Sequence, residues 1–184
     1  MKFIKTEIEG LIIIEPKVFG DDRGYFFESY NQKKFEEVVG KVLFIQDNES
    51  KSSKGVLRGL HFQKPPFDQA KLVRCVKGKV LDVAVDIRKG SKTYGKYIAI
   101  ELSSENNKQL FVPRGFAHGF LVLSESAIFA YKVDNVYAPD YDAGIYWNDP
   151  ILNIPWVINE SEIRVSEKDS KLSSFSRFKS PFVI

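Results

Sequence analysis

The chain of 184 residues has one cysteine and no long apolar segment, and both scarcities exclude classes of protein. A lone Cys75 cannot form an intrachain disulfide, which favours a reducing compartment. The apolar run 11–14 stops at Glu15 and Pro16, far short of the ~20 residues of a membrane helix. The first residues also lack the apolar region of a secretory signal peptide. The sequence therefore predicts a cytoplasmic protein.

The chain also lacks a strong charge of either sign. Its 27 Lys and Arg residues nearly balance 24 Asp and Glu residues, and the formal net charge is +3. The basic residues are interleaved with acidic ones and form no basic run, which argues against binding to a nucleic-acid backbone. A local positive pocket for one small anion stays open as an alternative.

What the sequence does contain is typical of an all-β protein. Aromatic residues make up 14% of the chain, and its apolar runs are short and separated by turn residues. Eight or more short strands in one domain, residues 1–184, predict a sandwich or small barrel, the jelly roll among them. We expect strands at residues 11–14, 25–30, 42–46, 71–76, 80–87, 97–102, 109–112, 120–123 and 127–133.

Other local patterns predict the connections between these strands. Asn31 is a suitable N-cap for a helix over residues 31–39. Residues 77–79 have the composition of a hairpin turn, residues 50–55 form a polar loop, and the tail from 165 to 184 is polar and loop-like. In residues 80–87 the apolar side chains alternate with Asp82 and Asp86, which predicts a strand with one core face and one polar or cavity face.

Histidine is also scarce, since the chain has only two. His61 lies in the segment GVLRGLHFQ (55–63), and His118 lies in PRGFAHGF (113–120). Histidine titrates near neutrality, so a scarce pair beside Gly and Arg indicates acid–base or ligand-binding work. The alternative is that each is a packed histidine donating to a backbone carbonyl.

These two segments resemble the signature stretches of the cupin superfamily, a jelly-roll or double-stranded β-helix barrel. In metal-binding cupins the first stretch reads G-x5-H-x-H with a following Glu, and the second reads P-x-G-x-x-H. Gln63 replaces the second histidine here, and Gln69 stands near the place of the carboxylate. Two imidazoles seldom hold a catalytic metal unaided, so we expect an acid–base enzyme without a functional metal.

A longer, ordered set of segments resembles one cupin family, the dTDP-4-dehydrorhamnose 3,5-epimerases. The matching segments are residues 20–28, 46–50, 56–63, 71–74, 113–120, 131–132, 147–150 and 166–169. The resemblance implies epimerisation at C3 and C5 of dTDP-4-dehydro-6-deoxy-D-glucose, without a cofactor, in a homodimer. The C4 ketone of this sugar acidifies the hydrogens on both neighbouring carbons. A base on one face and an acid on the other can then invert each centre.

The same resemblance implies the catalytic roles. His61 matches the base, Asp169 its hydrogen-bonding partner, Tyr131 the proton donor, and Lys71 the lysine at the C4 oxygen. Each also has an ordinary structural alternative. Asp169 alone would be a solvated tail charge, Tyr131 a core tyrosine, and Lys71 a lysine lying along the sheet surface.

The implied substrate contacts are spread along the chain. Arg23 and Arg58 match residues on the diphosphate, and Tyr137 matches an aromatic that stacks on thymine. Further contacts are implied for Glu28, Gln46, Asp47, Asn48, His118, Asp142 and Lys168. Asp142 departs from the family in length, since many relatives carry Glu there.

Three alternatives to this function stay open. A sibling enzyme would epimerise only C3 or only C5, or use another nucleotide sugar. A metal-dependent cupin oxygenase is disfavoured by Gln63. A non-catalytic sugar-binding module would have no need for a base, an enolate donor and an acid together.

Overall fold

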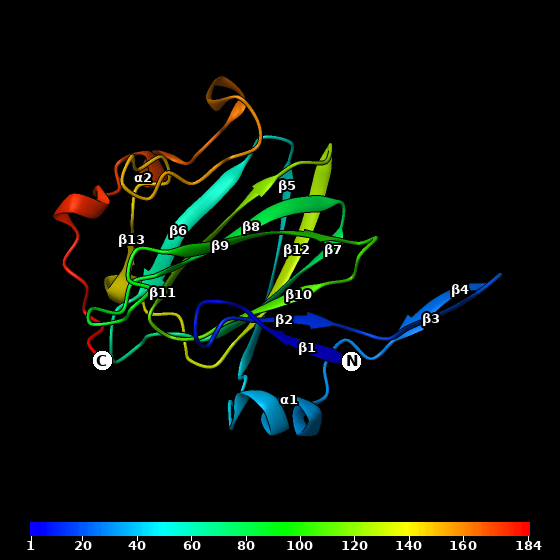
Figure 1. Cartoon of the computed structure of the whole chain (residues 1–184). Coiled ribbons are helices and arrows are strands. Elements are labelled where there is room, and N and C mark those ends of the chain that lie inside the picture. Colours follow the sequence, from blue (N-terminus) through cyan, green and yellow to red (C-terminus); the bar gives the residue numbers. More distant parts are fainter.

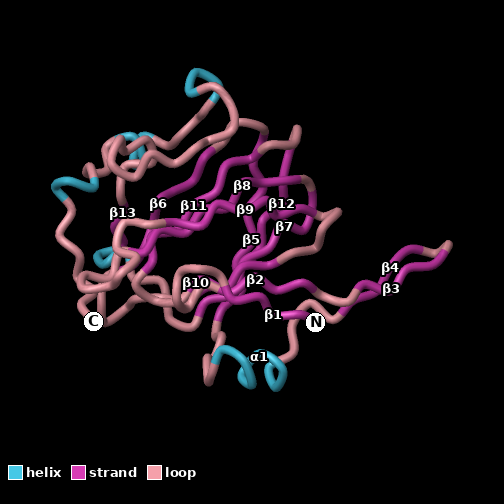
Figure 2. Tube along the Cα trace, in the orientation of Figure 1, coloured by secondary structure: helices cyan, strands magenta, loops and turns pink.

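The computed structural model describes all residues from Met1 to Ile184 and contains two facing antiparallel sheets (Figures 1 and 2). This is the predicted all-β jelly-roll barrel. The six-stranded sheet has the order β1-β2-β10-β7-β12-β5, and the five-stranded sheet has the order β13-β6-β11-β8-β9. The strands are β1 Lys2–Lys5, β2 Ile12–Glu15, β3 Val18–Asp21, β4 Gly24–Phe27, β5 Gln46–Ser53, β6 Leu57–Gln63, β7 Lys71–Lys77, β8 Lys79–Asp86, β9 Tyr97–Ser103, β10 Gln109–Val112, β11 Phe116–Val122, β12 Ser126–Val133 and β13 Asp142–Gly144.

The predicted turn at 77–79 exists, but the hairpin is wrong. Gly78 takes a φ of +79°, which a glycine adopts without strain, between β7 and β8. These two strands do not pair: β7 lies between β10 and β12, and β8 lies between β11 and β9. The turn therefore carries the chain from one sheet to the other, a distinction that turn composition does not encode.

The alternation predicted for residues 80–87 is present, but the apolar set 81, 83, 85 and 87 faces the C-terminal cover and not the space between the sheets. Val80 and Ala84 point inward and pack in the cluster that contains Val73 of the opposite sheet. Leu81, Val83, Val85 and Ile87 point to the outer face and belong to a second buried cluster. Both faces of this sheet are therefore covered.

Each sheet has its own cover on the outer face. The helix α1 (Gln32–Val39) covers the six-stranded sheet with Phe35, which is 1% exposed. The C-terminal third of the chain lies over the five-stranded sheet (Figure 1). Its Trp147, Trp156 and Phe178 pack in the buried cluster on that face. The prediction of a polar, loop-like tail was therefore incomplete, because aromatic side chains anchor the tail and it includes the short helix α2 (Glu167–Ser170).

The predicted helix is confirmed, and the Asn31 side chain accepts a hydrogen bond from the Lys34 N–H at 3.1 Å. The strand predicted at 42–46 is wrong. Val42 and Phe44 are apolar because they pack beside Phe35, and β5 starts only at Gln46. β5 then runs through most of the predicted polar loop. It is an edge strand paired along its length with β12, so backbone bonds hold it despite its polar sequence.

The β3–β4 hairpin projects away from the two sheets (Figure 1). Phe19, Tyr25 and Phe26 on this hairpin are more than half exposed. Elsewhere the chain has only short helices, and none is long and apolar enough to cross a membrane.

Candidate active site

Both histidines lie on the five-stranded sheet, opposite each other on neighbouring strands. His61 on β6 and His118 on β11 are partners in the antiparallel register. The strands approach closely beside this pair, where a Cβ on Gly59 would lie 2.5 Å from Gly119 Cα. The glycines of the two histidine motifs thus allow the packing that brings the histidines together.

His61 is paired with a buried carboxylate. Its Nε2 lies 2.7 Å from Oδ1 of Asp169, and the His61 side chain is 31% exposed while that of Asp169 is 4% exposed. The second carboxylate oxygen accepts the Gly59 N–H at 3.3 Å. Asp169 belongs to α2, whose N-cap Ser166 accepts the Asp169 N–H at 3.0 Å. The tail therefore delivers this carboxylate to β6 in a fixed position.

The lowered pKa of Asp169 suits it to stabilise a histidine that acts as a base. Burial acts to raise the pKa of Asp169, but the hydrogen bond and charge of His61 and the Gly59 and Ser166 bonds outweigh it and lower the pKa. Asp169 therefore stays anionic at neutral pH. An anion at this distance fixes the imidazole tautomer and stabilises its protonated form.

The opposite, six-stranded sheet contributes Lys71 from β7 and Tyr131 from β12. The Lys71 Nζ lies 5.9 Å from the centroid of the Tyr131 ring. Burial lowers the pKa of the Lys71 ammonium, against the opposing influence of Asp142 and Asp82. Burial raises the pKa of the Tyr131 hydroxyl, with Arg58 acting in the other direction. Tyr131 therefore stays protonated and able to donate.

These groups surround two adjoining hollows between the sheets. One has a volume of about 470 Å³ and the other of about 340 Å³, and His61, Lys71 and Tyr131 line both. The first also contains Arg58, His118, Lys168 and Asp169. The second contains Gln46, Asn48, Tyr137 and Asp142. The structure thus brings most of the predicted site residues to one cavity, named the interior cavity below.

The interior cavity is rich in cations that carry no carboxylate partner. Arg58 donates from Nε to the Ser52 hydroxyl at 3.1 Å and makes no ion pair. Arg164, which the sequence analysis did not single out, lines the same hollow and donates to the Lys54 carbonyl. Lys168 is the exception, since it pairs with Asp142 and this contact raises the lysine pKa. The unpaired guanidinium groups suit an anionic ligand such as a diphosphate.

The three residues of β5 that were predicted to bind the nucleotide lie on opposite faces of the sheet, because side chains alternate along a strand. Gln46 and Asn48 line the interior cavity, and the Gln46 amide donates to the Asn48 oxygen at 2.8 Å. The Asp47 side chain is 72% exposed and bonds Lys132 at 2.9 Å. Asp47 therefore points to the outer face of the sheet.

Besides Asp47, two further predicted ligand residues, Arg23 and Glu28, lie outside the interior cavity. Arg23 sits on the projecting β3–β4 hairpin and pairs with Asp21 at 2.5 Å. Glu28 accepts from Asn31 at 3.0 Å and pairs with Lys34 at 2.7 Å. Neither residue lines the hollows that contain His61.

Gln63, at the place of a metal-binding histidine in other cupins, holds a loop. Its amide donates to the Phe67 and Val136 carbonyls at 2.6 and 3.0 Å, and its oxygen accepts the Ala138 N–H at 2.7 Å. Gln63 therefore fixes the segment that carries Tyr137. No three histidine, cysteine or acidic side chains are grouped so as to hold a metal ion.

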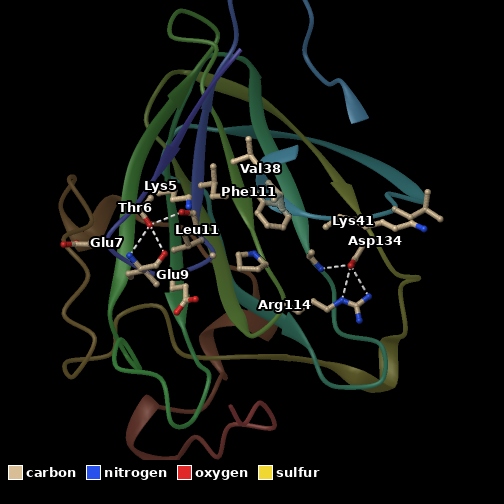
Figure 3. A pocket seen from close by; sticks show the side chains of 18 residues that line it. Lys5, Thr6, Glu7, Glu9, Leu11, Val38, Lys41, Phe111, Arg114 and Asp134 are labelled. Carbon is tan, nitrogen blue, oxygen red and sulfur yellow. Dashed lines mark hydrogen bonds and ion pairs between the residues drawn. The ribbon is translucent and has the colours of Figure 1, made fainter. Parts of the chain in front are cut away.

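A larger hollow, about 970 Å³, is lined by none of these residues; Figure 3 shows it from close by. It opens between the β1–β2 turn, the end of α1 and Pro113, and it contains no histidine. Its Arg114 and Asp134 pair with each other at 3.0 Å. Both histidines and Tyr131, the residues expected to transfer protons, therefore lie in the interior cavity and not in this larger space.

His118 is paired with a carboxylate that the sequence analysis placed on a polar or cavity face but did not assign to the site. Its Nε2 lies 2.9 Å and 3.1 Å from the two oxygens of Asp82, which is fully buried on β8. The alternation of residues 80–87 is the signal that could have found it. Nothing in the sequence around Arg164 marks it as a cavity residue.

The chain is similar to known proteins along most of its length. The family model described as dTDP-4-dehydrorhamnose 3,5-epimerase matches residues 5–177. A dTDP-4-dehydrorhamnose 3,5-epimerase of Shigella flexneri is 58% identical over 170 residues, which cover 92% of this chain and 93% of the relative.

Solved structures agree with this similarity. The dTDP-4-dehydrorhamnose 3,5-epimerase of Elizabethkingia anophelis is 55% identical with a TM-score of 0.92, covering 96% of this chain and 97% of that one. A Legionella pneumophila epimerase in complex with dTDP-4-keto-L-rhamnose is 47% identical, also with a TM-score of 0.92, covering 97% and 94%.

Proposed function

The chain belongs to the dTDP-4-dehydrorhamnose 3,5-epimerase family, and from this premise we propose how its interior cavity performs the reaction. The chain is an enzyme of dTDP-rhamnose biosynthesis with dTDP-4-dehydrorhamnose 3,5-epimerase activity. It converts dTDP-4-dehydro-6-deoxy-D-glucose into dTDP-4-dehydro-L-rhamnose by inverting C5 and C3. The observation that carries the mechanism is one cavity lined by a His61–Asp169 pair from one side and by Lys71 and Tyr131 from the other.

His61 is the base in this proposal. Its neutral imidazole removes the hydrogen from C5, and in a second round from C3, because both carbons neighbour the C4 ketone. Asp169, 2.7 Å from Nε2, stabilises the imidazolium that forms. A positioned acid–base group of this kind contributes about 10²–10⁴-fold to the rate.

The enolate formed in each step carries its negative charge on the C4 oxygen. Lys71 and His118 line the cavity as donors for this oxygen, and a preorganised donor at a developing oxyanion contributes about 3–4 kcal/mol. Burial lowers the pKa of Lys71, with Asp142 and Asp82 acting in the other direction. The same burial removes water that would screen the attraction between the Lys71 ammonium and the enolate.

Tyr131 returns the proton with inversion. It stands on the sheet opposite His61, and burial raises its pKa, which keeps the hydroxyl protonated until an enolate is present. Proton removal on one face and delivery on the other inverts the carbon. Arg58 binds the diphosphate, while Gln46, Asn48 and Tyr137 accommodate the nucleoside in the second hollow of the cavity.

The protein acts as a homodimer in this proposal. The β3–β4 hairpin leaves the body of the chain with Phe19, Tyr25 and Phe26 exposed, and Arg23 and Glu28 lie outside the chain's own cavity. A second copy would cover the apolar hairpin and receive these two residues near its own substrate. Sedimentation equilibrium should give twice the mass of the chain, and Phe26→Glu should shift the protein toward monomer. A monomeric protein with full activity would contradict this arrangement.

The function is tested by product analysis. Purified enzyme is incubated with dTDP-4-dehydro-6-deoxy-D-glucose, the product is reduced with borohydride, and the sugar is released by hydrolysis. Rhamnose among the released sugars requires inversion at both carbons. A sugar inverted only at C3 or only at C5 would identify the sibling activity, and an unchanged sugar would refute the assignment.

A further inference from the structure

We propose that Asp82 is a positioning residue of the active site, which holds His118 as an imidazolium with its second ring nitrogen directed into the interior cavity. This inference rests on the proposed function and adds to it a residue that does not contact the substrate. It is carried by the geometry of the Asp82–His118 pair.

Asp82 has no hydrogen-bond partner other than His118. It is 0% exposed, and its oxygens accept hydrogen bonds from Nε2 of His118 alone, at 2.9 and 3.1 Å. An ionised carboxylate costs several kcal/mol to bury unless a cation pairs with it. His118 is 7% exposed, so the attraction between the two groups is little screened by water. A protonated His118 therefore satisfies Asp82 better than a neutral one.

The other ring nitrogen of His118 is left for the cavity. Nδ1 makes no hydrogen bond within the chain, and no sealed side-chain nitrogen or oxygen lacks a partner. Nδ1 must therefore keep access to open space, and the hollow that His118 lines also contains His61, Lys71 and Tyr131. The Phe129 ring, nearly parallel at a centroid distance of 6.2 Å, packs beside the imidazole. As an imidazolium, His118 presents an Nδ1–H to the C4 oxygen.

The titratable groups around the Asp82–His118 pair allow the Asp82 carboxylate to act on two hydrogen-bond donors, His118 and Lys71. They are His61 across on β6, Lys71 and Cys75 on β7, and Tyr131 on β12. Burial and the charge of Asp82 raise the pKa of the Cys75 thiol to about 11, so that group is neutral. Asp82 also supports the protonated form of Lys71 against burial. Asp82 thus acts on both proposed ligands of the enolate oxygen.

The test compares Asp82→Asn with a matched control on the same strand. Asn preserves the shape and one acceptor but removes the charge, so kcat should fall about 10–100-fold with KM changed less than about threefold. Asp86→Asn is the control, because Asp86 is equally buried but bonds Arg88, Ser91 and Thr93 instead of a cavity residue. Asp86→Asn should lose stability and retain kcat.

Nitrogen-15 NMR of the histidine rings reads the proposed state directly, because the chain has only two histidines and a His61→Asn sample assigns them. Wild-type His118 should have both ring nitrogens protonated at pH 7, and Asp82→Asn should lose the Nδ1 proton. In a His118→Asn background, Asp82→Asn should lower kcat by less than about twofold further, since coupled residues are not additive.

Three results would overturn the inference. The first is an unprotonated His118 Nδ1 in the folded wild type, a measurement that requires no variant to fold. The second is an Asp82→Asn enzyme with kcat within threefold of wild type. The third is full additivity of the effects of Asp82→Asn and His118→Asn on kcat. An inactive wild type would instead refute the proposed function, and the NMR result would still report on the pair.

Discussion

Replacing Asp169 by asparagine tests how much the carboxylate contributes to the base. The imidazolium formed on His61 and the carboxylate are in contact, with a nitrogen–oxygen distance of 2.7 Å. Unit charges about 4 Å apart interact by about 4 kcal/mol at the effective dielectric constant of a protein surface site. His61 is 31% exposed, so solvent reduces this value. With about 1.4 kcal/mol per tenfold change in rate, we expect kcat to fall about 10²–10³-fold.

The substrate affinity should change little in the same variant. His61 is neutral before proton removal, so the lost charge stabilises mainly the transition state, and KM should stay within about threefold. Progress curves followed by proton NMR give both constants. A kcat within threefold of wild type, or a loss confined to KM, would refute the assignment of Asp169 to the base.

The contribution of the Asp169 carboxylate to the free energy of unfolding should also depend on pH. The folded-state pKa of Asp169 lies below that of an unfolded aspartate, about 3.9. The carboxylate therefore stabilises the fold above about pH 4, and this contribution is lost as the pH falls through the folded-state pKa. The unfolding free energies of wild type and Asp169→Asn should differ at pH 7 and converge in acid.

A second buried carboxylate of the C-terminal segment provides the control. Asp149 is 2% exposed and accepts the Phe175 and Ile151 N–H groups at 2.7 and 2.9 Å, but it does not line the interior cavity. Asp149→Asn should destabilise the tail without lowering kcat. Equal losses of kcat in both variants would mean that Asp169 acts only by anchoring the tail.

Four further predictions address the other groups. Tyr131→Phe should exchange deuterium into the starting sugar with retention yet form little epimer, and full epimerisation would make Tyr131 a core residue only. Arg58→Ala should raise KM more than tenfold with kcat changed less, unless the diphosphate also aligns the sugar, as steady-state kinetics will show. Because burial lowers the pKa of Lys71 and raises that of Tyr131, the alkaline limb of the kcat profile should follow Lys71, and Lys71→Arg should move this limb to higher pH. Exhaustive EDTA treatment should leave the rate unchanged, whereas activity lost with a stoichiometric metal would contradict the expectation of metal-free catalysis.

Much of the fold could be predicted because local patterns encode it. The alternation in β8 and the Asn31 cap of α1 report burial and backbone bonding directly. Which strands pair is decided by contacts distant in sequence, so the turn at Gly78 was misread as a hairpin. Residues 42–46 were misassigned because apolar residues packing under a helix resemble those of a short strand.

In the candidate site, too, local motifs identified some residues, while others depend on contacts between distant parts of the chain. The family motifs identified His61, Lys71, Tyr131 and Asp169, which the structure brings together from four separate elements. They did not identify Arg164, whose place in the cavity depends on a parallel backbone bridge between the tail and Val56, just before β6.

The central claim is that His61 enolises the sugar toward both neighbours of the C4 ketone. It is tested most directly by incubating the wild-type enzyme with dTDP-4-dehydro-6-deoxy-D-glucose in deuterium oxide and locating the label by NMR. The account predicts deuterium at both C3 and C5 of the product, and loss of both labels in His61→Asn. Deuterium at only one carbon, or exchange that persists in His61→Asn at more than a tenth of the wild-type rate, would contradict it.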